Sequence, residues 1–151
     1  MADLSFATHL YTSQNEYEAT AAGVQAMLEG LGNNILKNLG KVELGKSLRI
    51  FLQDAQGKVV GGITGELFGG WVYISLLWVD ETLRNQGCGS ELLQRLEAEA
   101  IRLGCKYAHV DTYSFEARPF YERAGYGVFG VLDDYPAGHQ KFFLRKTLIG
   151  G

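Results

Sequence analysis

The residues with the clearest chemical potential form a short glycine turn, Arg84-Asn85-Gln86-Gly87-Cys88-Gly89-Ser90. The start of a helix leaves several backbone N–H groups without partners and carries partial positive charge. Glycines remove side chains that would keep an anion away from those groups. The turn therefore predicts a phosphate cradle, to which Arg84 can add a charge-assisted contact and Ser90 a hydroxyl.

Two common nucleotide-binding motifs do not fit this turn. A P-loop would end in Gly-Lys-Ser/Thr, which is absent, and the dinucleotide fingerprint would place a glycine where the chain has Leu92. ATP and NAD are therefore disfavoured as ligands. On glycine content alone, an ordinary turn at a helix start explains the pattern equally well.

The elements that position the turn follow from periodicity. Residues 71–79 form the most hydrophobic strand, apolar on both faces as expected of a central strand. An amphipathic helix follows to about Leu103, and Gly104 closes it. Other strands are expected over residues 46–53, 58–68, 106–113, 126–132 and 139–147, and a short helix over 116–124.

The first forty residues are predicted as a strand and two helices. Residues 4–11 alternate as a strand, Asn15 begins a helix, and Gly32-Asn33-Asn34 is expected to end it before a second helix over 35–39. The resulting order is β, α, α, β, β, β, α, β, α, β, β, whose strand–helix–strand crossover forces at least one parallel pair. No linker divides the chain, so residues 1–151 are expected to form a single domain.

A second motif lies downstream, where residues 114–126 read Ser-Phe-Glu-Ala-Arg-Pro-Phe-Tyr-Glu-Arg-Ala-Gly-Tyr. Together with Arg-x-x-Gly-x-Gly from Arg84, this stretch resembles the paired motifs of the GNAT N-acetyltransferase superfamily. The family's later motif is often written N-x-x-A-x-x-F-Y-x-x-x-G-F, and its element order matches over essentially the whole chain. Ser114 departs from the usual asparagine, and Pro119 is unusual but tolerated early in a helix.

The resemblance implies an α+β (mixed α/β) fold, in which helices flank a central mixed, mostly antiparallel sheet and one strand–helix–strand crossover carries the cofactor site. It implies acetyl-CoA as cosubstrate and no metal. The residues expected to contact the cofactor are Leu77, Trp78, Val79, Arg84, Asn85, Gln86, Gly87, Cys88, Gly89, Ser90, Ser114 and Tyr121.

In this family the acceptor amine attacks the thioester directly. A backbone N–H around Trp78 or Val79 would stabilise the oxyanion. Tyr121 matches the family tyrosine that acts as general acid toward the leaving thiolate, although a core aromatic beside Phe120 would explain it too. These roles are implied by the resemblance.

The amine must also lose a proton, because a lysine-like amine has a pKa near ~10.4. Asp80 and Glu66 are candidates for the base, and Asp111 is a further carboxylate near the relevant strands. Each has an alternative reading as a solvated or hydrogen-bonded acid. His109 is expected to be a packed histidine, and Cys88 is not expected to act as a nucleophile, since direct attack is usual in the family.

The family builds its acceptor pocket from the first helices and the loop between the last two strands. That loop holds Asp133, Asp134, Tyr135 and His139, which suit a cationic amine but are also ordinary turn residues. The expected acceptor is a primary amine of a small molecule or a peptide, and its identity stays open. The alternative function is a non-catalytic acyl-CoA-binding sensor or interaction module of the same fold.

Composition limits the partners and the localisation expected of this protein. The formal net charge of −3 argues against nucleic acid as a main partner. The apolar stretch from Val72 to Val79 is far below the ~20 residues of a membrane span, and the N-terminus shows no signal-peptide pattern. Cys88 and Cys105 make no metal-spaced pair. A cytoplasmic protein is expected, and the resemblance allows a homodimer.

Overall fold

The computed structural model of the chain describes residues 5, 7, 18, 20–40 and 45–149. They fall into two compact units, Met1–Val42 and Glu43–Gly151. The strand predicted over residues 4–11 lies largely outside the described residues, and the helix start predicted at Asn15 lies outside them. Both stay predictions, as does the single domain expected over the whole chain.

The helix described in the first unit is α2 (Ala21–Leu39), which is continuous. The predicted break at Gly32-Asn33-Asn34, with a separate helix over 35–39, was wrong. Glycine and asparagine each cost a helix no more than about 1 kcal/mol, which is too little to end one that good helix formers continue on both sides. The Asn38 side-chain amide donates to the Asn34 carbonyl at 2.7 Å, one turn earlier in the same helix.

The second unit is built on a six-stranded sheet with the order β1-β2-β3-β4-β6-β5. Neighbouring strands are antiparallel except β3 and β4, which run parallel and are joined through helix α3 (Cys88–Arg102). The strands are β1 (Lys46–Gln53), β2 (Val59–Phe68), β3 (Trp71–Val79), β4 (Tyr107–Tyr113), β5 (Gly127–Asp133) and β6 (Gln140–Thr147).

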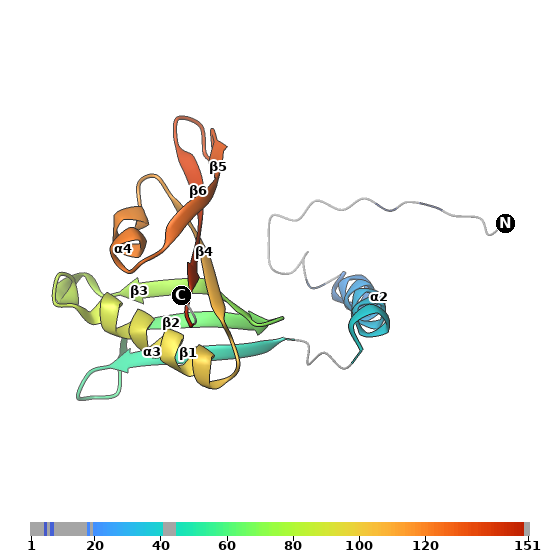
Figure 1. Cartoon of the computed structure of the whole chain (residues 1–151), viewed down its shortest axis with the longest axis horizontal. Coiled ribbons are helices and arrows are strands. Elements are labelled where there is room, and N and C mark those ends of the chain that lie inside the picture. The colour runs from blue at the N-terminus through green and yellow to red at the C-terminus, as the bar shows by residue number, and fades with distance from the viewer. Residues whose placement is uncertain (1–4, 6, 8–17, 19, 41–44, 150–151) are drawn as a thin grey trace. The chain divides into compact units, whose positions relative to one another are not determined.

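This architecture confirms the predicted α+β class and the predicted strand ranges, which agree closely at both ends of each strand. The short helix predicted over 116–124 is α4 (Arg118–Arg123), and a single 3-10 turn, η1 (Glu81–Leu83), precedes the glycine turn. Figure 1 shows β1–β3 turned away from β5 and β6, so that the sheet opens at the β3–β4 pair. This opening is where the sequence motifs meet.

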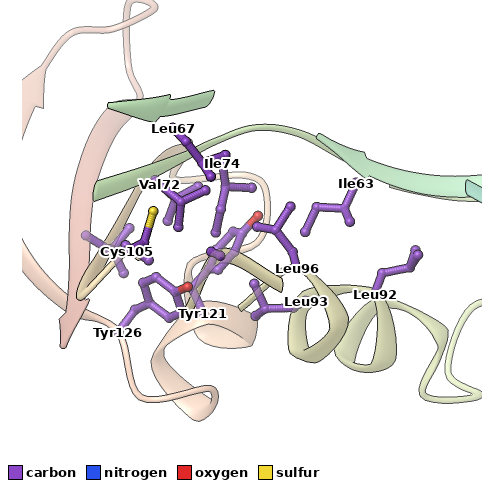
Figure 2. Close-up of a cluster of buried hydrophobic side chains, with 14 of the residues drawn as sticks. Ile63, Leu67, Val72, Ile74, Leu92, Leu93, Leu96, Cys105, Tyr121 and Tyr126 are labelled. Carbon is purple, nitrogen blue, oxygen red and sulfur yellow. The ribbon is translucent and has the colours of Figure 1, made fainter. Parts of the chain in front are cut away.

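The core lies between α3 and one face of the sheet. The buried residues of α3 recur at helical spacing and are Leu92, Leu93, Leu96 and Ala100. They pack with buried strand residues, among them Ile63, Val72 and Ile74 (Figure 2). Burying each large aliphatic side chain stabilises the fold by ~1.5–3 kcal/mol. This packing sets the first turn of α3 beside the end of β3.

A bulge at Ser75 changes which side chains of β3 face α3. Thr64 of β2 pairs with Leu76, whereas the next residue, Gly65, pairs with Ile74, which leaves Ser75 as the extra residue. Side chains alternate between faces along a strand, so one extra residue shifts the alternation. Ile74 is buried, but Leu76, two positions later, is 68% exposed. The bulge therefore reorients the end of β3, next to the glycine turn.

A polar contact ties α3 to the other half of the sheet. Glu97 accepts hydrogen bonds from the Tyr126 hydroxyl at 2.9 Å and from the Lys146 ammonium at 2.9 Å. Both members of the ion pair are largely shielded, with 13% of the Glu97 side chain and 25% of the Lys146 side chain exposed. Removing one partner would leave the other charge poorly solvated, so the contact fixes α3 against β6.

We expect Gly65→Ala to lower the free energy of unfolding by about 1–3 kcal/mol, the usual cost of overpacking a core. A Cβ at position 65 would lie 2.7 Å from Cγ2 of Val72 and 3.1 Å from Cδ1 of Leu96. Urea unfolding followed by circular dichroism measures the change. Gly127→Ala is the matched control in a strand, because a Cβ there meets nothing within 4 Å. Equal stability of the two variants would contradict the close approach of β2 to α3.

Candidate active site

A cleft of about 890 Å³ opens where β3 and β4 part. The parallel pairing joins Trp71–Ile74 to Tyr107–Val110 and goes no further, although both strands continue. The cleft is lined from β3, the glycine turn, α3, β4 and α4, including residues of both sequence motifs. Two segments that are about thirty residues apart in the sequence thus share one concave surface.

The first turn of α3 presents backbone donors to this cleft. Gly87 is the N-cap in a left-handed conformation, at φ 80°, and no side chain caps the helix. The first helical bond within α3 runs from the Glu91 N–H to the Gly87 carbonyl. The N–H groups of the three residues between them, Cys88, Gly89 and Ser90, therefore have no acceptor within the helix. All three residues line the cleft, so these N–H groups are positioned to donate to an anion there.

The approach to the helix is shaped by a second short turn. Asp80 caps η1 by accepting from the Thr82 N–H at 3.0 Å and the Thr82 hydroxyl at 2.7 Å. The Arg84 Nε donates to the Val79 carbonyl at 3.3 Å, which keeps the Arg84 side chain beside the end of β3. Arg84 and Asn85 both line the cleft, so a guanidinium faces the same space as the helix N-terminus.

The end of β3 offers backbone groups to the cleft. The Asp80 N–H donates to the Val60 carbonyl of β2 at 2.8 Å. Hydrogen bonds alternate along an antiparallel pair, so Trp78 also bonds toward β2, whereas Leu77 and Val79 direct their N–H and C=O groups away from it. With β4 no longer paired beyond Ile74, these groups point into the opening, and both residues line the cleft.

Tyr121 of α4 is both a core residue and a cleft residue. It is buried, with 4% of its surface exposed, and its ring packs edge-on against Phe120 with centroids 5.1 Å apart. Figure 2 shows it within the buried cluster near Ile74 and Leu96. Burial raises its pKa well above the usual range, and the nearby Glu116 and Asp111 charges add to this shift. The phenol therefore stays protonated at neutral pH and is available as a hydrogen donor.

Asp111 of β4 is a carboxylate that lines the same cleft. It accepts a hydrogen bond from the Tyr73 hydroxyl at 2.7 Å and forms an ion pair with the Lys141 ammonium at 3.4 Å. Burial, followed by this hydrogen bond, raises the pKa of Tyr73 to about 12. A histidine lies beside this group, since His109 stacks on Tyr73 with centroids 4.9 Å apart and is a packed residue, as predicted.

The structure brings together most of the predicted cofactor contacts. Those that line the cleft are Leu77, Val79, Arg84, Asn85, Gly87, Cys88, Gly89, Ser90 and Tyr121. Those outside its lining are Trp78, Gln86 and Ser114. The predicted bases Asp80 and Glu66 and the predicted acceptor-loop residues Asp133, Asp134 and Tyr135 also lie outside it.

The three predicted cofactor contacts outside the cleft lining point elsewhere or bond to nearby groups. The bulge turns the Trp78 side chain to the open face, where it is 51% exposed. The Gln86 side-chain amide donates to the Thr82 carbonyl at 3.3 Å, and the Ser114 hydroxyl accepts from the Gln140 N–H at 3.1 Å.

The two predicted bases are engaged elsewhere. Glu66 is exposed on β2 and accepts a hydrogen bond from the Ser47 hydroxyl. Asp80 is held by Thr82, and these hydrogen bonds, first from its hydroxyl and then from its N–H, lower the pKa of Asp80. Neither residue shares the cleft with Tyr121.

Among the described residues, the loop that was predicted to contact the acceptor is connected to the cleft through neighbouring side chains. Tyr135 stacks with Tyr113 at a centroid distance of 5.8 Å, and the Lys141 ammonium lies 4.8 Å from the centroid of the Tyr135 ring. Lys141 in turn contacts Asp111. The loop is thus connected to the cleft wall through one lysine.

Sequence reasoning missed several cleft residues. They come from the bulge in β3, from β4, from the segment before α4 and from the last residue of α4, and they include Ser75, Leu76, Thr112, Glu116 and Arg123. One sequence signal for this side of the cleft was Asp111. It is a charged residue inside a strand in which apolar and polar residues alternate. The sequence left it equal in weight to the other carboxylates.

Within the described ranges, no three His, Cys, Asp or Glu side chains gather into a metal-binding group. None of the helices described here combines the length and the hydropathy needed to cross a membrane.

Comparison with known proteins matches this chain to an acetyltransferase family. The model of the "Acetyltransferase (GNAT) family" matches residues 10–126. A blasticidin-S acetyltransferase of Streptomyces morookaense is 39% identical over 94 residues, which cover 62% of this chain and 69% of the relative.

Solved structures agree with this match. An acetyltransferase from Bacillus cereus ATCC 14579 superimposes with a TM-score of 0.73 at 30% identity, covering 93% of this chain and 97% of the other. An aminoglycoside 6′-N-acetyltransferase complexed with coenzyme A has a TM-score of 0.64 at 20% identity, covering 70% and 74% of the two chains. The second likeness concerns the fold alone.

Proposed function

The chain belongs to the GNAT acetyltransferase family, and on that premise we propose that it transfers an acetyl group from acetyl-CoA to a primary amine of a small molecule or peptide by direct attack. The observation that carries the proposal is that backbone anion donors, a protonated tyrosine and a carboxylate all line one cleft. When bound, acetyl-CoA would supply an electrophilic acyl carbon and a thiolate leaving group.

The residues of the cleft fit this cosubstrate. The pyrophosphate would lie on the first turn of α3, where Cys88, Gly89 and Ser90 present N–H groups and Arg84 adds a positive charge. The pantetheine arm carries amide groups, and the backbone of Leu77 and the Val79 N–H, on the edge that β4 does not pair, offer matching donors and an acceptor. A side chain at Gly89 would project toward Phe120 and narrow the cleft between these two residues.

Tyr121 is the proposed general acid. Its burial keeps the hydroxyl protonated, so it can donate to the sulfur as the carbon–sulfur bond breaks. Oxyanion stabilisation is proposed for a backbone N–H at the end of β3. The alternation of hydrogen bonds favours Val79 or Leu77 over Trp78, whose N–H is directed to β2.

The acceptor proposed is a small-molecule amine. A relative that covers much of this chain acts, by its name, on blasticidin S, and the acidic loop residues Asp133 and Asp134 suit an amine that arrives as a cation. The localisation that we propose for this enzyme is the cytoplasm, with no nucleic acid or membrane partner, and the proposed assembly is a homodimer.

The test combines binding and turnover. Isothermal titration with acetyl-CoA should give saturable binding, and thiol release should then be measured with blasticidin S, an aminoglycoside, spermidine and a short peptide as acceptors. Release that depends on one of these amines would support the proposal. Saturable binding without release from any amine would favour the non-catalytic acyl-CoA-binding module. No binding would contradict both functions.

A further inference from the structure

The cleft has two sides that differ in chemistry. Along β4, Val110 and Thr112 are buried toward the core, so the alternate residue Asp111 faces the other side of the sheet. Tyr121 belongs to the core side. The cleft therefore carries a phenol on one side of the sheet and a carboxylate on the other, with the end of β3 between them.

The second carboxylate of the cleft, Glu116, is on the phenol side. The Thr112 hydroxyl donates to Glu116 at 3.4 Å, and Thr112 is buried toward the core. The glycine turn, α3 and α4, which supply the proposed cofactor contacts, occupy this side too. An acceptor that approaches the thioester from the opposite face of the sheet would therefore lie beside Asp111 and not beside Glu116.

We propose that Asp111 is the group that takes the proton from the acceptor amine, with Tyr73 as the residue that positions it. The inference rests on the proposed function and deepens it by naming a base. Asp111 is the cleft carboxylate on the acceptor side, and its two oxygens are held by Tyr73 at 2.7 Å and Lys141 at 3.4 Å. Because each oxygen is held by a partner, the carboxylate has one orientation. Its remaining lone pairs therefore point in fixed directions.

The step balances as follows. The lone pair of the neutral amine forms the bond to the acyl carbon, and the nitrogen proton passes to an Asp111 oxygen. The carbon–sulfur bond breaks with its electron pair going to sulfur, which takes the Tyr121 proton. The proton on Asp111 returns to the Tyr121 phenolate through solvent at the cleft mouth, so one amine hydrogen ends on the thiol.

The charged surroundings of Asp111 come from several elements. The titratable groups that interact with it or with its partners are Tyr73 of β3, His109 and Tyr113 of β4, Glu116 before α4, Tyr121 of α4, Tyr135 of the loop and Lys141 of β6. Lys141 is the cation among them and is enclosed by the rings of Tyr113, Tyr135 and Phe143. An incoming ammonium would meet this cation, which favours the neutral form of the amine.

The experiment compares Asp111→Asn with Glu66→Gln in full-length protein. Glu66 pairs with Tyr73 across β2 and β3, so it is a carboxylate on the same face but outside the cleft. We expect Asp111→Asn to lower kcat/KM for the acceptor by about 100-fold or more, within the range of a lost general base. Acetyl-CoA affinity by titration should stay within about twofold in both variants, and Glu66→Gln should keep native turnover.

The pH profile separates a base from a structural role. In Asp111→Asn, kcat/KM should keep rising with pH throughout the alkaline range, because only solvent is left to take the proton. Asp111→Glu should restore part of the rate, whereas Tyr73→Phe should lower kcat/KM by roughly tenfold with a changed profile, because the carboxylate loses its orientation.

The outcomes are distinct. Asp111→Asn with native kcat/KM and native profile would overturn the assignment of the base and leave the acetyltransferase intact. A folded variant that loses acetyl-CoA affinity as much as turnover would also overturn it, since Asp111 would then act on the donor. If native protein binds acetyl-CoA but acetylates no amine, the proposed function fails and this inference fails with it.

Discussion

Replacing Gly87 with glutamate should weaken acetyl-CoA binding by about 100-fold or more. Gly87 is the N-cap of α3 at φ 80°, and a Cβ there meets no atom within 4 Å, so the new side chain would enter the open space before the helix. Its carboxylate would occupy the site proposed for the pyrophosphate and repel it. Losing two charge-assisted hydrogen bonds at about 1.5–3 kcal/mol each accounts for this factor. Isothermal titration with acetyl-CoA measures it.

Gly104→Glu is the matched control. Gly104 follows the other end of α3 at φ 97°, and a Cβ there also meets nothing within 4 Å. Both substitutions therefore carry a similar backbone strain of about 1–2 kcal/mol and the same added charge. Gly104→Glu should bind acetyl-CoA like native protein. Equal affinity of the two variants would show that the glycine turn has no part in holding the cosubstrate.

Tyr121→Phe should lower kcat by about 100-fold or more while leaving acetyl-CoA affinity within about twofold, because a general acid contributes in this range. The substitution keeps the ring and removes the hydroxyl, so the packing against Phe120 is retained. Steady-state thiol release with an amine that the native protein acetylates gives kcat, and titration gives the affinity for acetyl-CoA. A loss confined to KM would instead indicate a role in binding.

Tyr126→Phe is the control for losing a buried hydroxyl. Tyr126 is also buried, and its ring lies 5.6 Å from that of Tyr121, but its hydroxyl donates to Glu97 and it does not line the cleft. Lys146 still donates to Glu97 in this variant. It should therefore lose about 1.5–3 kcal/mol of stability, the contribution of one hydrogen bond to a charged group, and keep native kcat. If Tyr121→Phe keeps the native rate, or if both variants lose the same fraction of it, the role proposed for Tyr121 is wrong.

Substitutions at Gly87, Tyr121 and Asp111 separate donor binding from the two proton transfers. The roles proposed are donor binding at the helix terminus for Gly87, proton donation to the sulfur for Tyr121, and proton removal from the acceptor for Asp111, which faces the other side of the sheet. A protein that loses donor binding in the first variant, kcat in the second and acceptor kcat/KM in the third would be an acetyltransferase with these three roles divided among three elements.

The sequence by itself determined the local features of this protein. The ranges of the strands, the stripe of α3 and the glycine turn are set by periodicity and by residues whose backbone preferences act within a few positions. Pairing the turn at Arg84 with the motif at residues 114–126 was enough to predict the family, which the family model confirms. The same local reasoning overestimated the effect of Gly32-Asn33-Asn34, which α2 passes through.

Only the tertiary structure decided which side chains share the cleft. Alternation tells which residues of one strand share a face, but a bulge such as Ser75 shifts that alternation without any marker in composition. The point where β3 and β4 part depends on packing across the whole sheet. Tyr73 and Asp111 are far apart in the chain and meet because parallel strands pair, and this pairing singles out Asp111 from carboxylates that the sequence left equal.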